Sequence, residues 1–88
     1  MHRLSLRKGV EKAFRKLEKK DPELLDAISR KVEEILDDPH RYKNLRRPLQ
    51  HLRRVHGGKS HVIVFSIDDE RNLVIIEDFD HHDRMNQH

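Results

Sequence analysis

The chain contains no cysteine and no tryptophan, and only 5% of its residues are aromatic. Without cysteine, neither a disulfide framework nor a thiolate metal site is possible. No apolar run approaches the roughly 20 residues that a membrane-spanning helix needs, and the opening stretch "MHRLSLRKG" lacks the apolar segment of a signal peptide. We therefore expect a soluble protein of the cytoplasm that makes no contact with a membrane.

Hydrophobic residues are also scarce, at 34% of the chain, whereas charged residues make up 40%. A chain of 88 residues is long enough for one modest core and too short for two. The composition therefore predicts a single domain over residues 1–88, with a thin core and a strongly ionic surface.

The excess of basic over acidic residues is concentrated in one part of the chain. Residues 39–67 contain no aspartate or glutamate, although the whole chain has 16 acidic residues. The basic and histidine side chains of this segment are Arg41, Lys43, Arg46, Arg47, Arg53, Arg54 and Lys59, with His40, His51, His56 and His61. Such a segment is typical of a surface that binds a polyanion, and it predicts contact with nucleic acid. The alternative is a basic surface that only keeps the protein soluble.

The first half of the chain has the periodicity of a strand and two helices. Leu4 and Leu6 alternate with polar residues and predict a short first strand. Apolar residues then recur at helical spacing over residues 8–20 and again after Asp21, which can cap the second helix. Pro39 ends that second helix. The two amphipathic helices are predicted to form an αα-hairpin.

The second half changes to the periodicity of strands. Strands are predicted over residues 51–56, 61–67 and 73–79, with the middle one apolar on both faces, as expected of a central strand. Pro48 argues against a central strand in the irregular stretch that precedes them. The predicted fold class is α+β, with the order β-α-α-β-β-β and the αα-hairpin packed on a mainly antiparallel sheet.

Several side chains suited to phosphate chemistry could gather at one edge of this sheet. The set consists of His56, His61, His82, Lys59 and either Arg53 or Arg54. A pair of histidines can act as general base and general acid near neutral pH, and arginine or lysine can neutralise the charge that develops on a phosphate. RNA supplies its own nucleophile, the 2′-hydroxyl, so this chemistry needs no serine or cysteine.

Each of these residues also has a simpler interpretation. A surface histidine is usually solvated or hydrogen-bonded, and the two arginines could contact backbone phosphate or only solvent. Asp78, Asp80 and Asp83 would repel RNA, so we expect them to orient a histidine or to pair with arginine.

The tail offers a further alternative, a metal site. His81, His82 and Asp83 carry imidazole and carboxylate ligands. Adjacent residues rarely converge on one ion, however, and the sequence has no spaced HxxxH or HExxH pattern. We therefore expect neither a metal ion nor another cofactor.

The order of elements and two local strings resemble the RelE/ParE toxin superfamily over nearly the whole chain. The string "YKNLRRPLQHLRRVHGGKSHVIVFSID" is similar to the second and third strands of that family with their tight turn, and "DFDHHDRMN" is similar to its terminal segment, H-x-x-x-Y or H-x-x-x-F. The resemblance implies a RelE-like fold and a type II toxin. Such a toxin is an endoribonuclease that cuts mRNA in the ribosomal A site by metal-independent attack of the 2′-hydroxyl. Its implied partners are the ribosome, mRNA and a cognate antitoxin, with which it would form a hetero-oligomer.

The match is closest to the RelE and YafQ-like mRNA interferases, of which the YafQ-like branch relies on histidines. His56 matches the histidine of the family's second strand, and His82 matches the tail histidine. Arg54 falls where many members carry a basic residue, and His61 falls where many carry an arginine. These four are the predicted catalytic residues. The predicted RNA-binding residues are Arg46, Arg47, Arg53, Lys59, His81 and Asn86.

Asn86 departs from the family, because an aromatic residue is expected at its position. Three functions therefore remain open: the ribosome-dependent nuclease, a ParE-like inhibitor that binds gyrase without chemistry, and a catalytically inactive homologue that only binds an antitoxin. The histidine cluster argues against the second, and Asn86 supports the third. The thin core also predicts an exposed apolar groove along the αα-hairpin that an antitoxin helix could fill.

Overall fold

The computed structural model describes residues 1–82, so the predictions for Asp83 and Asn86 lie outside the described part of the chain. Its elements are β1 (Arg3–Leu6), α1 (Lys8–Lys20), α2 (Pro22–Asp37), the 3₁₀ helix η1 (Pro39–Arg41), β2 (Arg53–Gly57), β3 (His61–Asp68) and β4 (Leu73–His81). Within residues 1–82, no helix combines the length and the apolar character that crossing a bilayer requires.

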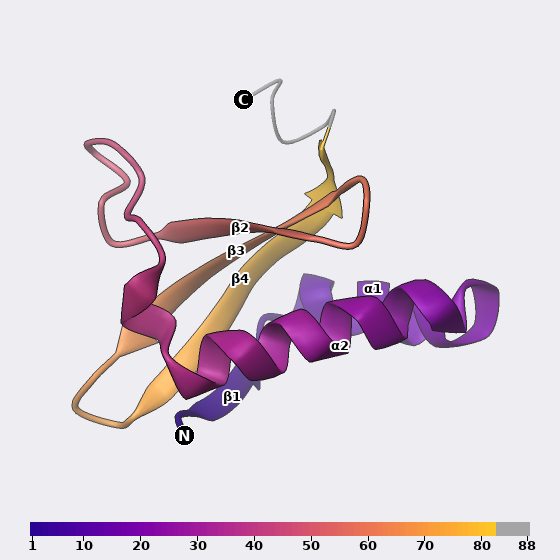
Figure 1. Ribbon diagram of the computed structural model, residues 1–88, viewed down its shortest axis with the longest axis horizontal. Coiled ribbons are helices and arrows are strands. Elements are labelled where there is room, and N and C mark those ends of the chain that lie inside the picture. Colours follow the sequence, from indigo (N-terminus) through magenta and orange to yellow (C-terminus); the bar gives the residue numbers. More distant parts are fainter. Residues whose placement is uncertain (83–88) are drawn as a thin grey trace.

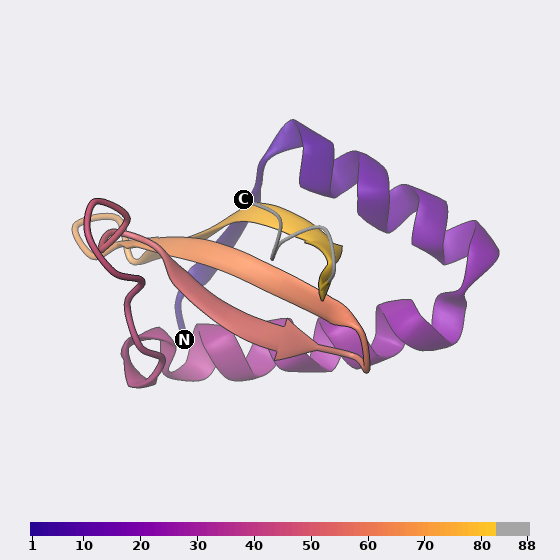
Figure 2. The same ribbon diagram turned by 90° about the horizontal axis from the view of Figure 1, so that it is seen from above.

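The four strands form one mixed sheet in the order β1-β4-β3-β2. β1 runs parallel to β4, whereas the two contacts of β3, with β2 and with β4, are antiparallel. Both α-helices lie on one side of the sheet (Figure 1), and the view from above looks onto the other side (Figure 2). We call this second side the open face. The predicted α+β class, with a helical hairpin on a mainly antiparallel sheet, is confirmed.

The break between the two α-helices follows from the sequence "DPE". The Asp21 carboxylate accepts a hydrogen bond from the backbone N–H of Leu24 at 3.1 Å, which satisfies one of the unpaired donors of the new helix. Pro22 stands at the first turn of α2, where its missing N–H costs nothing. The predicted cap and helix start are therefore confirmed.

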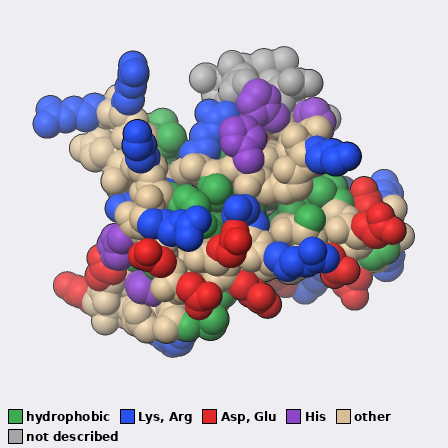
Figure 3. Space-filling view, viewed as in Figure 1, with side chains coloured by type: hydrophobic (Ala, Val, Ile, Leu, Met, Phe, Trp, Pro, Cys, Tyr) green, Lys and Arg blue, Asp and Glu red, His purple; other side chains and the backbone are tan. Residues whose placement is uncertain are grey.

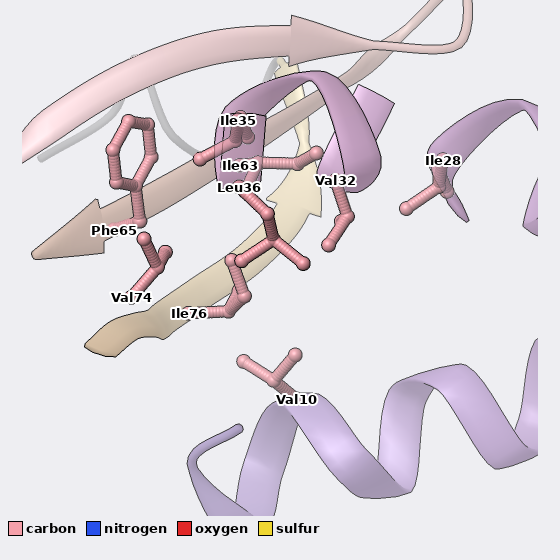
Figure 4. Packing of buried hydrophobic residues seen from close by; sticks show 9 residues of the cluster. All are labelled: Val10, Ile28, Val32, Ile35, Leu36, Ile63, Phe65, Val74 and Ile76. Carbon is pink, nitrogen blue, oxygen red and sulfur yellow. The ribbon is translucent and has the colours of Figure 1, made fainter. Parts of the chain in front are cut away.

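The core lies between the two α-helices, mainly α2, and the face of the sheet that they cover (Figure 4). It is built from Val10, Ile28, Val32, Ile35, Leu36, Ile63, Phe65, Val74 and Ile76. Ile63 and Phe65 alternate with Val62 and Val64 along β3, and side chains of a strand point to opposite faces in turn. Val62 and Val64 therefore belong to the open face, although both are buried.

Two strand boundaries differ from the prediction by two residues, and both differences affect the site. β2 begins at Arg53, because the N–H of Leu52 closes a turn on the carbonyl of Leu49 at 2.9 Å and keeps His51 in the loop. β4 continues to His81, because the register pairs it with His61 at the start of β3. His81 is thus the last residue of the strand instead of lying past its end.

Candidate functional site

Two rows of side chains cross the open face from β2 through β3 to β4. The strand register aligns Arg54 with Val64 and Asp78 in the first row, and His56 with Val62 and Asp80 in the second. Each row therefore has a basic or imidazole side chain at one end, a buried valine in the middle and a carboxylate at the other end. The valines of β3 therefore form an apolar floor, with the basic and imidazole side chains of β2 on one side and the carboxylates of β4 on the other.

His82 joins this face directly after β4. Its backbone N–H donates a hydrogen bond to the carbonyl of Ser60 at 2.6 Å, which holds the end of β4 against the turn between β2 and β3. The rings of His56 and His82 are stacked, with centroids 5.3 Å apart and planes inclined by 24°. Figure 3 shows histidine side chains gathered at the top of this surface, close to lysine and arginine side chains. Two of the four predicted catalytic residues therefore touch, although they are far apart in the chain.

A pocket of about 330 Å³ lies beside the first row. Its wall is the loop between η1 and β2, and its floor is the sheet; it is lined by Leu45, Leu49, Leu52, Arg54, Val64, Glu77 and Asp78. Leu49 is 46% exposed there and forms part of the apolar wall. The pocket joins an apolar wall to the guanidinium of Arg54 and to the carboxylates of Glu77 and Asp78, so it offers an apolar surface, one cationic group and two acidic groups.

The register of β3 with β4 shifts between Val64 and Phe65, so that Glu77 is the extra residue of a β-bulge in β4. This bulge explains why two consecutive acidic residues, Glu77 and Asp78, line the pocket. Burial alone would raise the pKa of Glu77, but hydrogen bonds from Arg7 at 2.7 Å and Ser66 at 2.6 Å, with the charge of Arg7, lower it overall. The same contact raises the pKa of Arg7. Glu77 is therefore an ionised group whose charge is balanced by a neighbouring arginine.

Asp78 and Asp80 have a local structural role. Each carboxylate accepts a hydrogen bond from the backbone N–H of the next residue, at 2.8 Å for Phe79 and 2.7 Å for His81. The rows place Asp78 across from Arg54 and Asp80 across from His56. That these carboxylates orient a histidine or pair with an arginine stays a prediction.

His61 is not part of this group. β3 pairs His61 with Gly57 and Val62 with His56, so the alternation of the strand puts His61 and His56 on opposite faces. The ring of His61 stacks on Phe79 at 5.0 Å and meets the edge of His81 at 5.2 Å. The expectation that His61 would gather with His56 and His82 is therefore wrong. The reason is that His61 pairs across the turn with Gly57 and not with His56.

The environment of His61 makes folding sensitive to acid. Burial, followed by the nearby charge of His81, lowers the pKa of His61, and Asp80 and Asp21 offset only part of this effect. Among residues 1–82, no group forms a hydrogen bond to its buried Nδ1. As the pH falls, the unfolded chain binds a proton at His61 before the folded chain does, because the pKa of His61 is lower in the folded chain. The contribution of neutral His61 to the free energy of unfolding is therefore present above about pH 6.5. It is lost as the pH falls through the folded-state pKa of His61.

We expect His61→Phe to lose less stability on acidification than the unmodified chain. Phenylalanine keeps a ring on Phe79 but has no proton to bind. The measurement is the urea midpoint between about pH 7.5 and about pH 5.5. His51→Gln, a change at an exposed loop histidine, serves as the control and should retain the original slope. Equal slopes for His61→Phe and the unmodified chain would contradict this account.

The predicted RNA-binding residues are placed in different ways. Arg46, Arg47, Lys59 and His81 are exposed, the first two in the loop before β2 and Lys59 in the turn after it. Arg53 is half-buried, and its Nε donates a hydrogen bond to the carbonyl of Tyr42 at 2.8 Å. Arg53 therefore anchors the loop that forms the pocket wall, a role that its sequence context did not reveal.

Comparison with known proteins adds a family to this geometry. A family model described as the ParE toxin of the type II toxin–antitoxin system parDE matches residues 4–86. An uncharacterized protein of Methanosarcina mazei is 49% identical over 85 residues, which cover 97% of this chain and 99% of that protein. A protein of Methanocaldococcus jannaschii with the provisional toxin name RelE4 is 46% identical over 85 residues, covering 97% of this chain and 90% of the relative.

Solved structures support the same fold. The toxin–antitoxin complex RelBE2 of Mycobacterium tuberculosis contains a chain that superposes with a TM-score of 0.75 at 24% identity, over 91% of this chain and 96% of that one. The isolated RelE toxin of E. coli superposes with a TM-score of 0.74 at 18% identity, over 92% of this chain and 84% of the toxin. At these identities the likeness concerns the fold alone.

Proposed function

The chain belongs to the family of ParE toxins of type II toxin–antitoxin systems, within the RelE/ParE superfamily, and from this premise we propose that it is an endoribonuclease that cuts mRNA on the ribosome. The observation that carries the proposal is the contact between His56 and His82 in a row next to Arg54. Two imidazoles and a guanidinium can supply the general base, the general acid and the charge stabilisation that phosphodiester cleavage by RNA's own hydroxyl needs.

The reaction uses each of these groups once. One imidazole accepts the proton of the 2′-hydroxyl, whose oxygen attacks the adjacent phosphorus. The bond from phosphorus to the 5′-oxygen breaks, and the second imidazole donates a proton to that oxygen. The products are a 2′,3′-cyclic phosphate and a 5′-hydroxyl end. Arg54 would lie against the phosphate and stabilise the charge on its non-bridging oxygens, and no metal ion or cofactor takes part in these steps.

The charges of the open face suggest why a ribosome would be needed. Asp78 and Asp80 line the same rows as Arg54 and His56, so free RNA meets repulsion as well as attraction there. A ribosome holds the mRNA in place and leaves the toxin to supply orientation and proton transfer. Arg46, Arg47 and Lys59 are exposed around this face and would contact phosphates of the RNA.

The antitoxin partner has a candidate binding site on the opposite side of the protein. An apolar groove of about 420 Å³ lies between the helices and β1, and its apolar lining includes Leu4, Leu6, Phe14, Val32 and Leu36. Leu4 is 43% exposed within it. An amphipathic segment of the antitoxin would fill this groove and complete the thin core, forming a toxin–antitoxin hetero-oligomer.

The test is to add the purified chain to ribosomes programmed with a defined mRNA and to map the new 5′ ends. We expect cuts at the A-site codon and none in the same mRNA without ribosomes. A second candidate function follows from the name of the matching family model, the ParE toxins: inhibition of gyrase without chemistry. Intact mRNA on ribosomes together with loss of gyrase supercoiling would replace the nuclease proposal by this one. Failure of both assays would leave a homologue that only binds its antitoxin.

A further inference from the structure

A second cluster of ionisable side chains lies at the far end of the sheet from His56 and His82. It joins His2, which precedes β1, His40 of η1 and Asp69 in the turn between β3 and β4. Nε2 of His40 is 2.8 Å from Oδ1 of Asp69, and Nε2 of His2 is 3.8 Å from the same oxygen. In Figure 3, histidine and acidic side chains adjoin one another at the lower left, around η1 and this turn.

The backbone holds the three segments of this cluster together. The N–H of His2 donates to the carbonyl of Leu36 at 2.9 Å, at the end of α2 just before η1. The N–H of Arg3 donates to the carbonyl of Asn72 at 2.8 Å, which ties the first strand to the β3–β4 turn. The side chain of His2 is only 19% exposed, so its ring is held in place by its surroundings. The cluster is therefore organised before any ligand binds.

We propose that His2, His40 and Asp69 form a binding site for a divalent transition-metal ion, for which zinc is the best fit. Two imidazole nitrogens and one carboxylate oxygen are a common zinc ligand set, with a water completing the tetrahedron. The three ligand atoms lie within 4.8 Å of one another. Zinc with bonds of about 2.0–2.1 Å separates its ligand atoms by about 3.3 Å, so the ligand atoms would have to move relative to one another by at most about 1.5 Å.

The charges around the cluster are mixed. Asp37 and Asp38 precede η1, and Asp68 and Glu70 flank Asp69. Arg3, Arg41 and Arg71 also lie next to the cluster in the sequence, and Arg71 pairs with Asp68 at 3.8 Å, so the proposed site depends on its ligand atoms and not on an excess of negative charge. The side chains of His40 and Asp69 are 50% and 66% exposed, which leaves room for the water ligand. The rival explanation is that His40 and Asp69 only form a hydrogen bond with each other and that the cluster binds no metal ion.

A metal ion here would link the start of the chain, η1 and the β3–β4 turn, three segments that are distant in the sequence. Because such a site does not exist in the unfolded chain, binding would stabilise the fold. At a free metal concentration of about one hundred times the dissociation constant, the thermal midpoint should rise by about 10 °C or more.

The experiment uses the full, tag-free chain after treatment with a chelator and dialysis. Co²⁺ is titrated while the visible absorption of tetrahedral cobalt is followed, and Zn²⁺ is then added in competition. We expect one equivalent of Co²⁺ to bind, Zn²⁺ to displace it, and the thermal midpoint to rise with Zn²⁺. His40→Ala and Asp69→Asn, two changes of exposed side chains, should each weaken binding at least about tenfold.

The matched control is the double variant His81→Ala/His82→Ala, which removes the histidines of the tail and keeps the proposed ligands. It should bind Co²⁺ as the unmodified chain does. Absence of both the cobalt absorption and the thermal shift would overturn the proposal, in favour of a hydrogen-bonded cluster. Binding that survives His40→Ala but disappears in the tail variant would also overturn it, because the metal would then belong to the tail.

Discussion

Replacing His56 by alanine is expected to slow mRNA cleavage on programmed ribosomes by about 10²- to 10⁴-fold, the usual contribution of a general acid or base. His82→Ala should have an effect of similar size. Both side chains lie on the open face, outside the core cluster, so neither change should unfold the protein. Thermal midpoints within a few degrees of the unmodified chain would verify that the fold is kept.

The double variant gives the sharper test, because it asks whether the two histidines act as a unit. The two stacked rings, 5.3 Å apart, would supply the general base and the general acid of one cleavage reaction, so removing the second after the first should cost little more. We therefore expect His56→Ala/His82→Ala to be nearly as active as the weaker of the two single variants. A loss equal to the product of both single losses would indicate that the residues act independently.

His51→Ala provides the matched control for these variants. His51 belongs to the same basic segment but lies in the loop, outside the two rows of the open face. Its replacement should leave the cleavage rate within about twofold, as is usual for surface positions without a named role. If His56→Ala and His82→Ala behaved like this control, the contact of the two rings would have no catalytic meaning. The nuclease proposal would then lose the observation on which it rests.

The helices and the order of the elements along the chain could be predicted because their signals are local. The apolar stripe, the cap at Asp21 and the break at Pro39 depend on residues a few positions apart, and the structure confirms them. The start of β2 is predicted two residues early because a turn competes with the alternating pattern. Alternation in "HLRRVH" continues through His51 and Leu52, but a turn hydrogen bond from Leu52 to Leu49 removes both residues from the sheet.

The side-chain clusters were harder to predict, because they depend on register. One position of offset in the turn after β2 decides that His56 faces the open side while His61 faces the covered side. The resemblance to toxins pointed to both histidines without distinguishing their faces. The cluster of His2, His40 and Asp69 had no signal in the sequence at all, because three separate segments supply one residue each. Only the path of the chain brings them together.

The largest effect on stability is expected for Phe65→Ala. Phe65 is fully buried at the centre of the core, and its ring meets the edge of Tyr42 at 5.8 Å. Removing such a side chain leaves a cavity and usually costs about 3–5 kcal/mol. A domain of this size has a total stability of about 4–13 kcal/mol, so the thermal midpoint should fall by about 15–30 °C. Differential scanning calorimetry would measure the shift.

Leu49→Ala is the control for this substitution, because Leu49 is an apolar residue that is 46% exposed in the pocket wall. Its thermal midpoint should change little, as expected when no core volume is lost. Equal shifts for Phe65→Ala and Leu49→Ala would mean that the core does not lie where the packing indicates.

The loss of cleavage in His56→Ala and the loss of stability in Phe65→Ala can be distinguished by measuring activity at several temperatures. Phe65 is not part of the proposed catalytic site, but its neighbour Val64 lies in the middle of the row that joins Arg54 to Asp78. Unfolding of the core therefore removes the site as well, and Phe65→Ala should cut mRNA at low temperature and fail near its lowered midpoint. His56→Ala should fail at every temperature, because its fold is intact and only a proton carrier is missing. If Phe65→Ala were inactive even where calorimetry finds it folded, the core would position the open face more tightly than stability alone requires.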